Sequence, residues 1–453
     1  MTFSKNDLLF IPLGGSGEIG MNCNLYHYNG SWIMIDLGVM FGNSSMSPNE
    51  LIMPDLSFLK ENKIKLSGLI LTHAHEDHIG AVPYLYNQLN NVPIFTTSFT
   101  ASVLKRKFMS NDVKDYDLRS LDYNKQITIG EFVIEIFALT HSIPEPNAII
   151  LKTQKGNIFH TGDWKIDPEP LIGQPIDLEK LKKIKSEGID AMICDSTNVF
   201  DENPSGSEKE VRDVFRKIFS EKKKGKIFVT CFASNIARLE TVLKVSEELN
   251  KFCVFAGRSI HRIFESAVEN NYLTDFKNIV TEKEARVISD DDLVIICTGS
   301  QGEENAALSK LVGGKNTNIE IYKEDLIIFS SREIPGNEKK INSLKEKLLK
   351  KNCKYLDHRM SKVHVSGHPS KNELKKMYNW ISPHTVIPVH GEYRHMVEQV
   401  NFAKKSGVKN QVLIQNGDVV KINKCNVNIS SKVFSGRNML KGKEIIPINS
   451  EIF

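Results

Sequence analysis

The sequence has no closely paired cysteines, no long apolar run and no large excess of charge. Its seven cysteines are scattered over 453 residues without a C-x-x-C pair, which favours buried reduced thiols over a disulfide framework. No segment reaches the roughly eighteen apolar residues of a membrane span, and the N-terminus lacks the apolar core of a signal peptide. These absences predict a cytoplasmic protein that does not enter a membrane.

The charge is nearly balanced, with 59 Lys and Arg against 55 Asp and Glu, a net charge of +4. Bulk charge of this size does not indicate a nucleic-acid-binding protein, although a basic groove can lie within a balanced total. The content of 40% hydrophobic and 25% charged residues is that of a globular protein. The chain is long enough for two or three domains.

The densest chemical signal is Thr-His-Ala-His-Glu-Asp-His at residues 72–78. It follows an apolar run at 69–71 that is typical of a short buried strand, and apolar residues at helical spacing continue from 79 to 89. The cluster therefore lies on a predicted strand-to-helix turn. The alternative is a polar loop whose histidines are held by ordinary hydrogen bonds.

Imidazole and carboxylate ligands together suit zinc, manganese or iron better than calcium. Four ligands on so short a loop cannot easily all reach one tetrahedral ion. The spacing predicts two neighbouring ions, with His73 and His75 on one and Asp77 and His78 on the other.

Several other apolar segments deliver one histidine or aspartate near a predicted strand end. These residues are Asp36, His141, Asp163, Asp195, His364, His368 and His390. Each alone is more often a cap or a turn residue, but the series favours a shared cleft. Two cations bridged by Asp163 would hold a hydroxide nucleophile and attract an anionic oxygen, so a phosphodiester or a carbonyl is the expected target. Alternation along a strand would place His364, Ser366 and His368 on one side, to grip phosphate and assist the leaving oxygen.

Two glycine-rich stretches suggest phosphate binding. Residues 14–20 contain a literal G-x-G-x-x-G. However, strands at 24–28 and 32–36, joined as a hairpin by an Asn29-Gly30 turn, replace the helix of a dinucleotide fold, so we expect a tight loop at the cleft edge. Residues 298–302 precede a helical run predicted at 303–311 and could cradle a phosphate.

From about residue 201 to 360, predicted strands and helices alternate, which indicates a separate domain with a parallel sheet. Strand-end histidines resume after it. Because those late histidines must return to the first cleft, residues 201–360 are expected to be an insertion.

These motifs resemble a known family. His73-x-His75-x-Asp77-His78, with Asp36, His141 and Asp163, resembles the metallo-β-lactamase superfamily, and Asp195, His368 and His390 resemble the further motifs of its β-CASP nucleases. Four more segments look like those of bacterial ribonuclease J: Leu13 to Gly20, Phe232 to Asn235, Thr298 to Glu303 and Ile334 to Glu338.

The resemblance implies an α/β fold, a metallo-β-lactamase αββα sandwich with an inserted β-CASP domain. The expected divisions are a first part of the sandwich at 1–200, the β-CASP domain at 201–360, the second part at 361–430 and a C-terminal remnant or linker at 431–453.

The resemblance also implies which residues bind the metals. One metal would be held by His73, His75 and His141, the other by Asp77, His78 and His390, with Asp163 shared. The expected cofactor is two Zn²⁺ ions, with Mn²⁺ or Mg²⁺ as alternatives.

Further roles follow from the same resemblance. Asp36 would support the metal shell, and His368, paired with Asp195, would donate a proton to the departing 3′-oxygen, so that these residues and Asp77 form the catalytic set. His364 and Ser366 would hold substrate phosphate. Ser234, Asn235 and Ser300 are candidates for a 5′-monophosphate pocket, with helix capping or turn formation an equal alternative.

The expected function is hydrolysis of single-stranded RNA by a metal-bridging hydroxide. Cleavage would be 5′-to-3′ exonucleolytic, endonucleolytic or both, in RNA maturation and decay, with 5′-monophosphorylated RNA as partner. His390 favours RNA, because the DNA-repair branch of the family lacks it. Compared with the longer bacterial enzymes, we expect most of the family's C-terminal domain to be lacking after about 450, which leaves a homodimer open. The alternatives are a small-molecule hydrolase, such as a lactonase or thioesterase, and an RNA-binding scaffold with a vestigial site.

Overall fold

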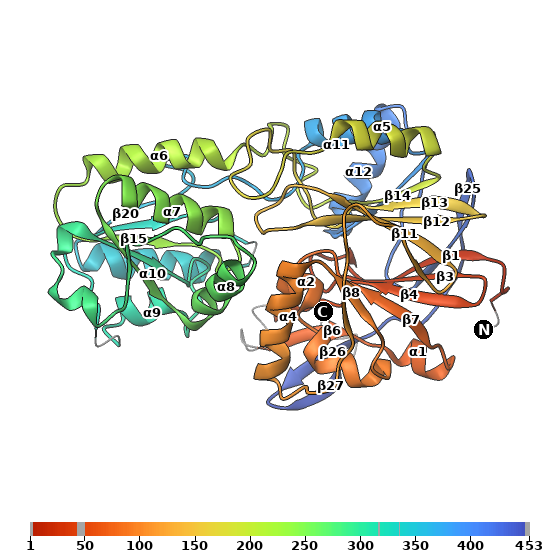
Figure 1. The fold of residues 1–453 in the computed structure, drawn as a ribbon, viewed down its shortest axis with the longest axis horizontal. Helices are drawn as coiled ribbons and strands as arrows, with labels where there is room; N and C mark the ends of the chain where they lie inside the picture. The colour runs from red at the N-terminus through yellow and green to blue at the C-terminus, as the bar shows by residue number, and fades with distance from the viewer. Residues whose placement is uncertain (1–2, 43–49, 316–317, 335, 449–453) are drawn as a thin grey trace.

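The protein, here a computed structural model that describes residues 3–42, 50–315, 318–334 and 336–448, forms two lobes (Figure 1). Pro335, part of one quoted motif, lies outside the described residues. The larger lobe contains the first and last described strands, and the smaller lobe is built from the middle of the sequence, coloured green to cyan.

One sheet of the larger lobe has eight strands in the order β25-β24-β1-β3-β4-β7-β8-β9. They are β1 (Leu8–Gly14), β3 (Cys23–Tyr28), β4 (Ser31–Ile35), β7 (Leu66–Ile70), β8 (Ile94–Thr96), β9 (Leu118–Ser120), β24 (Asp418–Asn423) and β25 (Asn426–Lys432). The predicted hairpin of β3 and β4 is confirmed, and its turn residues Asn29 and Gly30 have positive φ of 49° and 84°. Because β4 and β7 are parallel, the loops that follow them meet at one edge.

The second sheet has seven strands in the order β10-β11-β12-β13-β14-β21-β23. They are β10 (Ile127–Ile129), β11 (Phe132–Ala138), β12 (Asn147–Thr153), β13 (Gly156–His160), β14 (Ala191–Asp195), β21 (Thr385–Val389) and β23 (Asn410–Gln411). Neighbours β13, β14 and β21 run parallel. Their carboxyl ends therefore lie together, and each is followed or ended by a predicted site residue.

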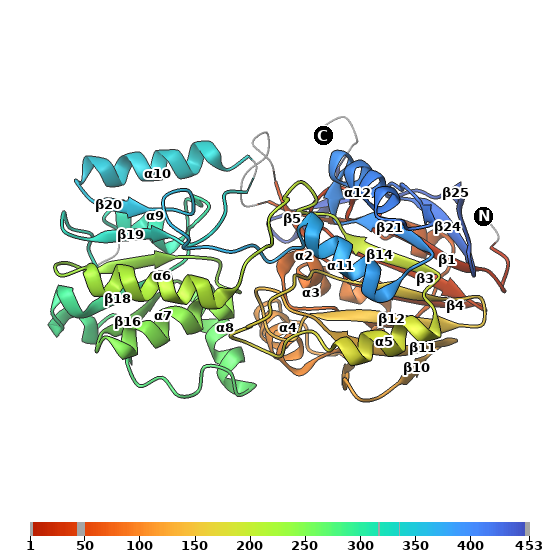
Figure 2. The ribbon, with the colours of Figure 1, turned by 90° about the horizontal axis from the view of Figure 1, so that it is seen from above.

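The two sheets face each other across an apolar core. Residues of both sheets fill it, among them Phe10, Ile33, Ile149 and Ile193. The first sheet is covered by α1 (Ser57–Glu61), α2 (Glu76–Ile79), α3 (Val82–Leu85) and α4 (Ser98–Ser110), and the second by α5 (Leu178–Glu187), α11 (Lys371–Ile381) and α12 (Tyr393–Lys405) (Figures 1 and 2). The predicted αββα sandwich is confirmed.

The smaller lobe has one six-stranded sheet in the order β17-β16-β18-β15-β19-β20. Its strands are β15 (Ile227–Thr230), β16 (Phe252–Ala256), β17 (Ile279–Val280), β18 (Leu293–Cys297), β19 (Leu326–Phe329) and β20 (Lys354–Leu356). All pairings are parallel. The covering helices are α6 (Glu208–Glu221), α7 (Ile236–Glu248), α8 (Arg258–Glu269), α9 (Ala307–Val312) and α10 (Glu338–Lys350). The expected alternation of strands and helices is confirmed.

Three local expectations are wrong. The helix expected over 79–89 is broken into α2, α3 and a 3₁₀ turn, Tyr86–Leu89, with Pro83 at the start of α3. The helix expected over 303–311 begins only at Ala307. Residues 363–368 belong to no strand, so strand alternation cannot be what sets the direction of His364, Ser366 and His368.

The C-terminal segment is paired into sheets as far as Ile448, and 449–453 lie outside the described residues. β26 (Arg437–Lys441) and β27 (Glu444–Ile448) form a four-stranded sheet with β6 (Leu51–Pro54) and β5 (Met40–Phe41). The described part of the segment expected to be a C-terminal remnant or linker is therefore built into the larger lobe. Within the part of the chain that the structure describes, no helix is long and apolar enough to cross a membrane.

Candidate metal centre

The histidine cluster spans the loop after β7 and the start of α2, which contains Asp77 and His78. A loop that follows β4 packs directly against it: Leu37 N–H donates to the His78 carbonyl at 2.8 Å, and Gly38 lies so close that an added Cβ would stand 1.7 Å from the Asp77 carbonyl oxygen. Only glycine permits this approach. The predicted turn is confirmed, and tight packing holds its backbone.

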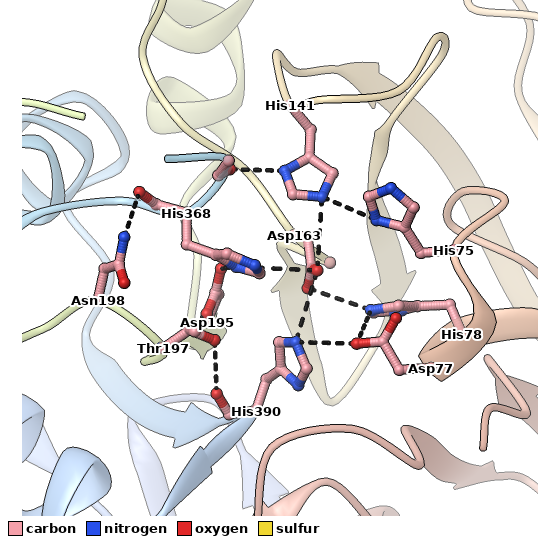
Figure 3. Close-up of polar contacts among 12 residues, drawn as sticks. His75, Asp77, His78, His141, Asp163, Asp195, Thr197, Asn198, His368 and His390 are labelled. Carbon is pink, nitrogen blue, oxygen red and sulfur yellow. Dashed lines mark hydrogen bonds and ion pairs between the residues drawn. The ribbon is translucent and has the colours of Figure 1, made fainter. Parts of the chain in front are cut away.

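The first group of possible ligands contains His73, His75, His141 and Asp163. Figure 3 labels His75, His141 and Asp163. Nδ1 of His75 lies 3.1 Å from Nε2 of His73 and 3.0 Å from Nε2 of His141. Asp163 Oδ2 is 3.7 Å from Nε2 of both His73 and His141. The three imidazoles and one carboxylate thus converge on one point.

The second group contains Asp77, His78, Asp163 and His390 (Figure 3). His78 Nε2 lies 3.2 Å from Asp163 Oδ1. His390 Nε2 lies 3.3 Å from Asp77 Oδ2 and 3.5 Å from Asp163 Oδ2. Asp163 is common to both groups, so one carboxylate lies between two ligand clusters.

The donor set fits a pair of divalent cations. Burial, reinforced by neighbouring imidazoles, lowers the pKa of His73 and His75 well below the usual value and that of His141 to about 4. These three rings of the first group are therefore neutral at physiological pH, as metal ligands must be. In the second group the neighbouring carboxylates prevail over burial and raise the pKa of His78 and His390, so a cation bound there would displace a proton. Oδ1 of buried Asp163 accepts no hydrogen bond, which is costly unless a cation or another charge lies beside it.

Asp36 orients His78 from behind. Its Oδ2 is 2.7 Å from His78 Nδ1, and its Oδ1 accepts the Thr72 N–H at 2.8 Å. Burial lowers the pKa of His78, but Asp163, Asp77 and Asp36 outweigh it and raise the pKa well above the usual value. Asp36 adopts a φ of +63°, a strained conformation that the surrounding contacts maintain.

The glycine-rich loop at 14–20 holds His390. The His390 N–H donates to the Gly15 carbonyl at 2.6 Å, and the Gly20 N–H lies 3.3 Å from His390 Nδ1. Strand β2 (Ser16–Gly17) pairs with β22 (Gly391–Glu392) beside it. The expectation of a tight loop at the cleft edge is confirmed.

This loop is in turn fastened to the C-terminal segment. The buried Glu18 carboxylate accepts hydrogen bonds from the Arg437 guanidinium on β26 and from the Asn416 amide, the latter at 2.6 Å. Asn416 Oδ1 also accepts the Ser16 N–H at 2.9 Å. Residues about 400 positions apart thus support the same ligand.

His368 and Asp195 form a third group with Asp163. His368 Nδ1 is 2.8 Å from Asp195 Oδ2 and 3.8 Å from Asp163 Oδ2. Burial lowers the pKa of His368, but the attraction of Asp195 and then Asp163 prevails and raises it to about 9. His368 is therefore protonated at neutral pH beside the two ligand groups.

Several supporting residues were missed by the sequence analysis. The Asn198 amide donates to Ser366 Oγ and, at 3.3 Å, to the His368 carbonyl. The Thr197 hydroxyl donates to the His390 carbonyl at 2.9 Å (Figure 3). The only sequence signal for Thr197 and Asn198 was their position just after Asp195. Thr72 contacts the cluster and is adjacent to it in sequence. Asn22, which contacts His78 from 56 positions away, had no sequence signal.

His364 and Ser366 line a cavity of about 500 Å³ at the junction of the lobes, together with Asn198, Arg332 and Arg359. His364 Nδ1 is buried without a hydrogen-bond partner. Burial and the nearby Arg238 lower the pKa of His364 well below the usual value. A neutral imidazole and two guanidinium groups thus border one polar cavity.

The three residues considered for a 5′-phosphate pocket lie in the smaller lobe. Asn235 caps α7, because its Oδ1 accepts the Arg238 N–H at 2.9 Å. Ser300 is buried, and Ser234 is half-buried beside the cap. Asn235 therefore makes the helix-capping contact that was given as the alternative to phosphate binding.

The fold and the site define a metallo-β-lactamase-type hydrolase with an inserted β-CASP lobe. Three family models agree with this class: a beta-lactamase superfamily domain at 32–206, the beta-CASP domain of ribonuclease J at 224–348 and a Zn-dependent metallo-hydrolase RNA specificity domain at 357–413.

The chain is 38% identical to ribonuclease J of Sinorhizobium meliloti over 92% of this chain and 74% of the relative. It is 35% identical to that of Mycolicibacterium smegmatis, over 95% and 77%, and 33% identical to one from Helicobacter pylori, over 99% and 66%. A protein of unknown function from Enterococcus faecalis shares the fold, with a TM-score of 0.65, 16% identity and coverage of 92% of this chain and all of that one. The chain belongs to the ribonuclease J family, whose enzymes are metal-dependent ribonucleases.

Proposed function

We propose that this chain hydrolyses phosphodiester bonds in single-stranded RNA with two divalent cations, most simply Zn²⁺, and leaves a 5′-phosphate on the product. The observation that carries the proposal is Asp163, a carboxylate common to both groups of ligands. Its Oδ2 lies 3.7 Å from His73 and His141 of one group and 3.5 Å from His390 of the other. We assign His73, His75 and His141 to one cation and Asp77, His78 and His390 to the other.

When bound, cations in such a site lower the pKa of water and neutralise charge on a phosphodiester. The protein residues hold and orient the ligands. Neutral His73, His75 and His141 present nitrogen lone pairs, while Asp36 holds the ring of His78 and the 14–20 loop holds His390. The ligands are thus oriented before substrate arrives, which spares reorganisation during the reaction.

His368 is proposed as the proton donor to the departing 3′-oxygen. It is a protonated imidazole beside both ligand groups that belongs to neither, and Asp195 holds it through Nδ1. This contact leaves Nε2 as the nitrogen that can face a leaving group. Without a proton the leaving alkoxide would be a poor leaving group, so general-acid help of about 100- to 10,000-fold is expected.

Substrate phosphate is proposed to bind at the junction cavity. His364, Ser366 and Asn198 border it close to His368, and Arg332 and Arg359 supply positive charge. Arg332 is already paired with Asp201 and Arg359 with Glu333, so phosphate must compete with these exposed pairs. A preference for 5′-monophosphorylated ends and a role for Ser234 and Ser300 in it belong to the same proposal.

We retain the divisions 1–200, 201–360 and 361–430 as the proposed domains, and we retain the cytoplasm as the proposed location. The homodimer stays a prediction.

The test uses RNA labelled at its 5′ end. Cleavage should require added Zn²⁺ or Mn²⁺, stop with a chelator and resume when metal is restored. His78→Ala should abolish it while the variant unfolds cooperatively. Cleavage that survives either treatment contradicts the two-cation site, and the length of the labelled product distinguishes stepwise trimming from internal cuts.

A further inference from the structure

We infer that Arg238 is a positioning residue for substrate binding, because it anchors the returning segment, residues 361–370, that carries His364, Ser366 and His368. This inference rests on the proposed function of that segment. Arg238 lies on α7 in the smaller lobe and touches none of the proposed metal ligands.

The Arg238 guanidinium is fully buried and completely hydrogen-bonded. Nε and Nη2 donate to the two carboxylate oxygens of Glu208 at 3.2–3.3 Å. Nη1 donates to the Ser330 carbonyl at 2.9 Å and to the Val363 carbonyl at 2.8 Å. One side chain therefore joins three segments of the chain.

These segments include both connections between the lobes (Figure 2). Glu208 begins α6, the first helix after the chain leaves the larger lobe, and Val363 lies on the returning segment, one residue before His364. Ser330 follows β19 in the parallel sheet. Arg238 thus fastens the outgoing and returning connections to the core of the smaller lobe.

The same network continues into the larger lobe. The Glu208 N–H donates to Asp167 Oδ2 at 3.1 Å, and Lys165 Nζ lies 3.2 Å from the same oxygen. Lys165 N–H donates to the Thr140 carbonyl at 2.7 Å, and the next residue is the proposed ligand His141. Buried charges therefore connect Arg238 to the loops of the metal centre.

Stability alone does not account for this arrangement. Replacing a buried ion pair with apolar residues of similar volume is often neutral or stabilising, so such a pair is weak evidence for a stabilising role. A guanidinium has five donors in a fixed fork and can direct several carbonyls at once, which lysine cannot do. The geometry suits a residue that sets the position of other segments.

The position of the returning segment depends on such anchors because it lies in no strand. Beyond Val363, it is held by Asn198 at Ser366 and by His141, whose Nδ1 lies 2.6 Å from the Gly367 carbonyl. Removing Arg238 leaves the Val363 carbonyl with the Ser330 hydroxyl alone, which donates to it at 2.7 Å. The end next to His364 is thereby loosened, whereas the end next to the metal centre keeps its contacts. The affinity for RNA should therefore fall, whereas the positions of the metal ligands should not change.

The test compares two variants with a matched control. The double variant Arg238→Met with Glu208→Met replaces the buried pair with apolar side chains, and Arg238→Lys keeps only the charge. The control is Arg216→Met with Glu248→Met, which removes an exposed pair between the same helices, α6 and α7. Each is assayed for zinc content, cooperative unfolding, RNA cleavage and hydrolysis of bis(p-nitrophenyl) phosphate, a small diester that needs only the metal centre.

For both Arg238 variants we expect normal zinc content and cooperative unfolding. kcat/KM for RNA should fall on the order of a hundredfold, mainly through KM, as misplacement of a distant support can cause. Hydrolysis of the small diester should stay close to wild type, and the control should be unchanged on both substrates.

Three results overturn the inference: equal losses on RNA and on the small diester, unchanged RNA cleavage, or loss of cooperative unfolding in both Arg238 variants, which would make Arg238 a determinant of stability alone. Failure of the wild-type protein to cleave RNA, with normal zinc content, would instead refute the proposed function.

Discussion

Replacing His368 with alanine tests the chemical step. Its Nδ1 lies 2.8 Å from Asp195 Oδ2, and the neighbouring carboxylates raise its pKa to about 9 against the effect of burial. The ring is thus protonated at neutral pH and suited to give its proton to a leaving oxygen. We expect kcat to fall by about 100- to 10,000-fold, or roughly 3 to 5 kcal/mol of activation free energy. Zinc content should not change, since two four-residue ligand groups are complete without His368.

The assay is single-turnover cleavage of an RNA with sulfur in place of the bridging 3′-oxygen at one bond. A thiolate leaves without a proton, so His368→Ala should recover most of the lost rate on this substrate. An equal loss on the sulfur-containing and the normal RNA would refute the role of proton donor.

The pH profile supplies an independent check. A required proton donor makes activity fall as pH rises through its pKa, which for His368 is about 9. Asp195→Asn removes the largest attraction that holds this proton, so the alkaline fall should move to lower pH. A profile that keeps its position in this variant would show that another group controls it.

Three further predictions concern support and stability. Asp36→Asn should weaken zinc binding by about 10- to 100-fold because it disturbs the orientation of His78. A competition titration measures the zinc affinity, and excess zinc should restore activity. Unchanged zinc affinity would contradict this prediction. Arg437→Ala should weaken zinc binding and speed amide hydrogen exchange in the 14–20 loop, because Glu18 loses its ion pair with Arg437. An effect on exchange confined to β26 would show that the C-terminal segment is not coupled to the site. Phe159→Ala, in a fully buried position, should lower the free energy of unfolding by about 3 to 5 kcal/mol in urea, and a loss of less than about 1 kcal/mol would mean that the core closes around the cavity.

Much of the site could be predicted from the sequence because its residues are of rare types and lie in short motifs. His73 to His78 lie within six positions, and a dense run of imidazoles and carboxylates after an apolar strand has few structural explanations. The hairpin at Asn29-Gly30 was equally clear, since its turn needs two residues that tolerate positive φ. Such signals are local, so they can be recognised without knowing how the chain packs.

Other expectations failed because they were settled by contacts distant in sequence. Alternation could not describe 363–368, which is held by Asn198, His141 and Arg238 and pairs with no strand. Asn235 could be interpreted either as a phosphate ligand or as a cap, and only the folded helix shows its contact with the Arg238 N–H.

By itself, the sequence determined the ligand chemistry and the presence of an inserted lobe, because these depend on residue types and on periodicity along the chain, whereas the αββα class came from the resemblance of its motifs to a known family. Tertiary structure alone decided that Glu18 and Arg437 support His390 and that Arg238 joins the two lobe connections. The physical reason is that buried polar groups must find partners wherever packing places them. A hydrogen bond between residues hundreds of positions apart leaves no periodic trace in the sequence.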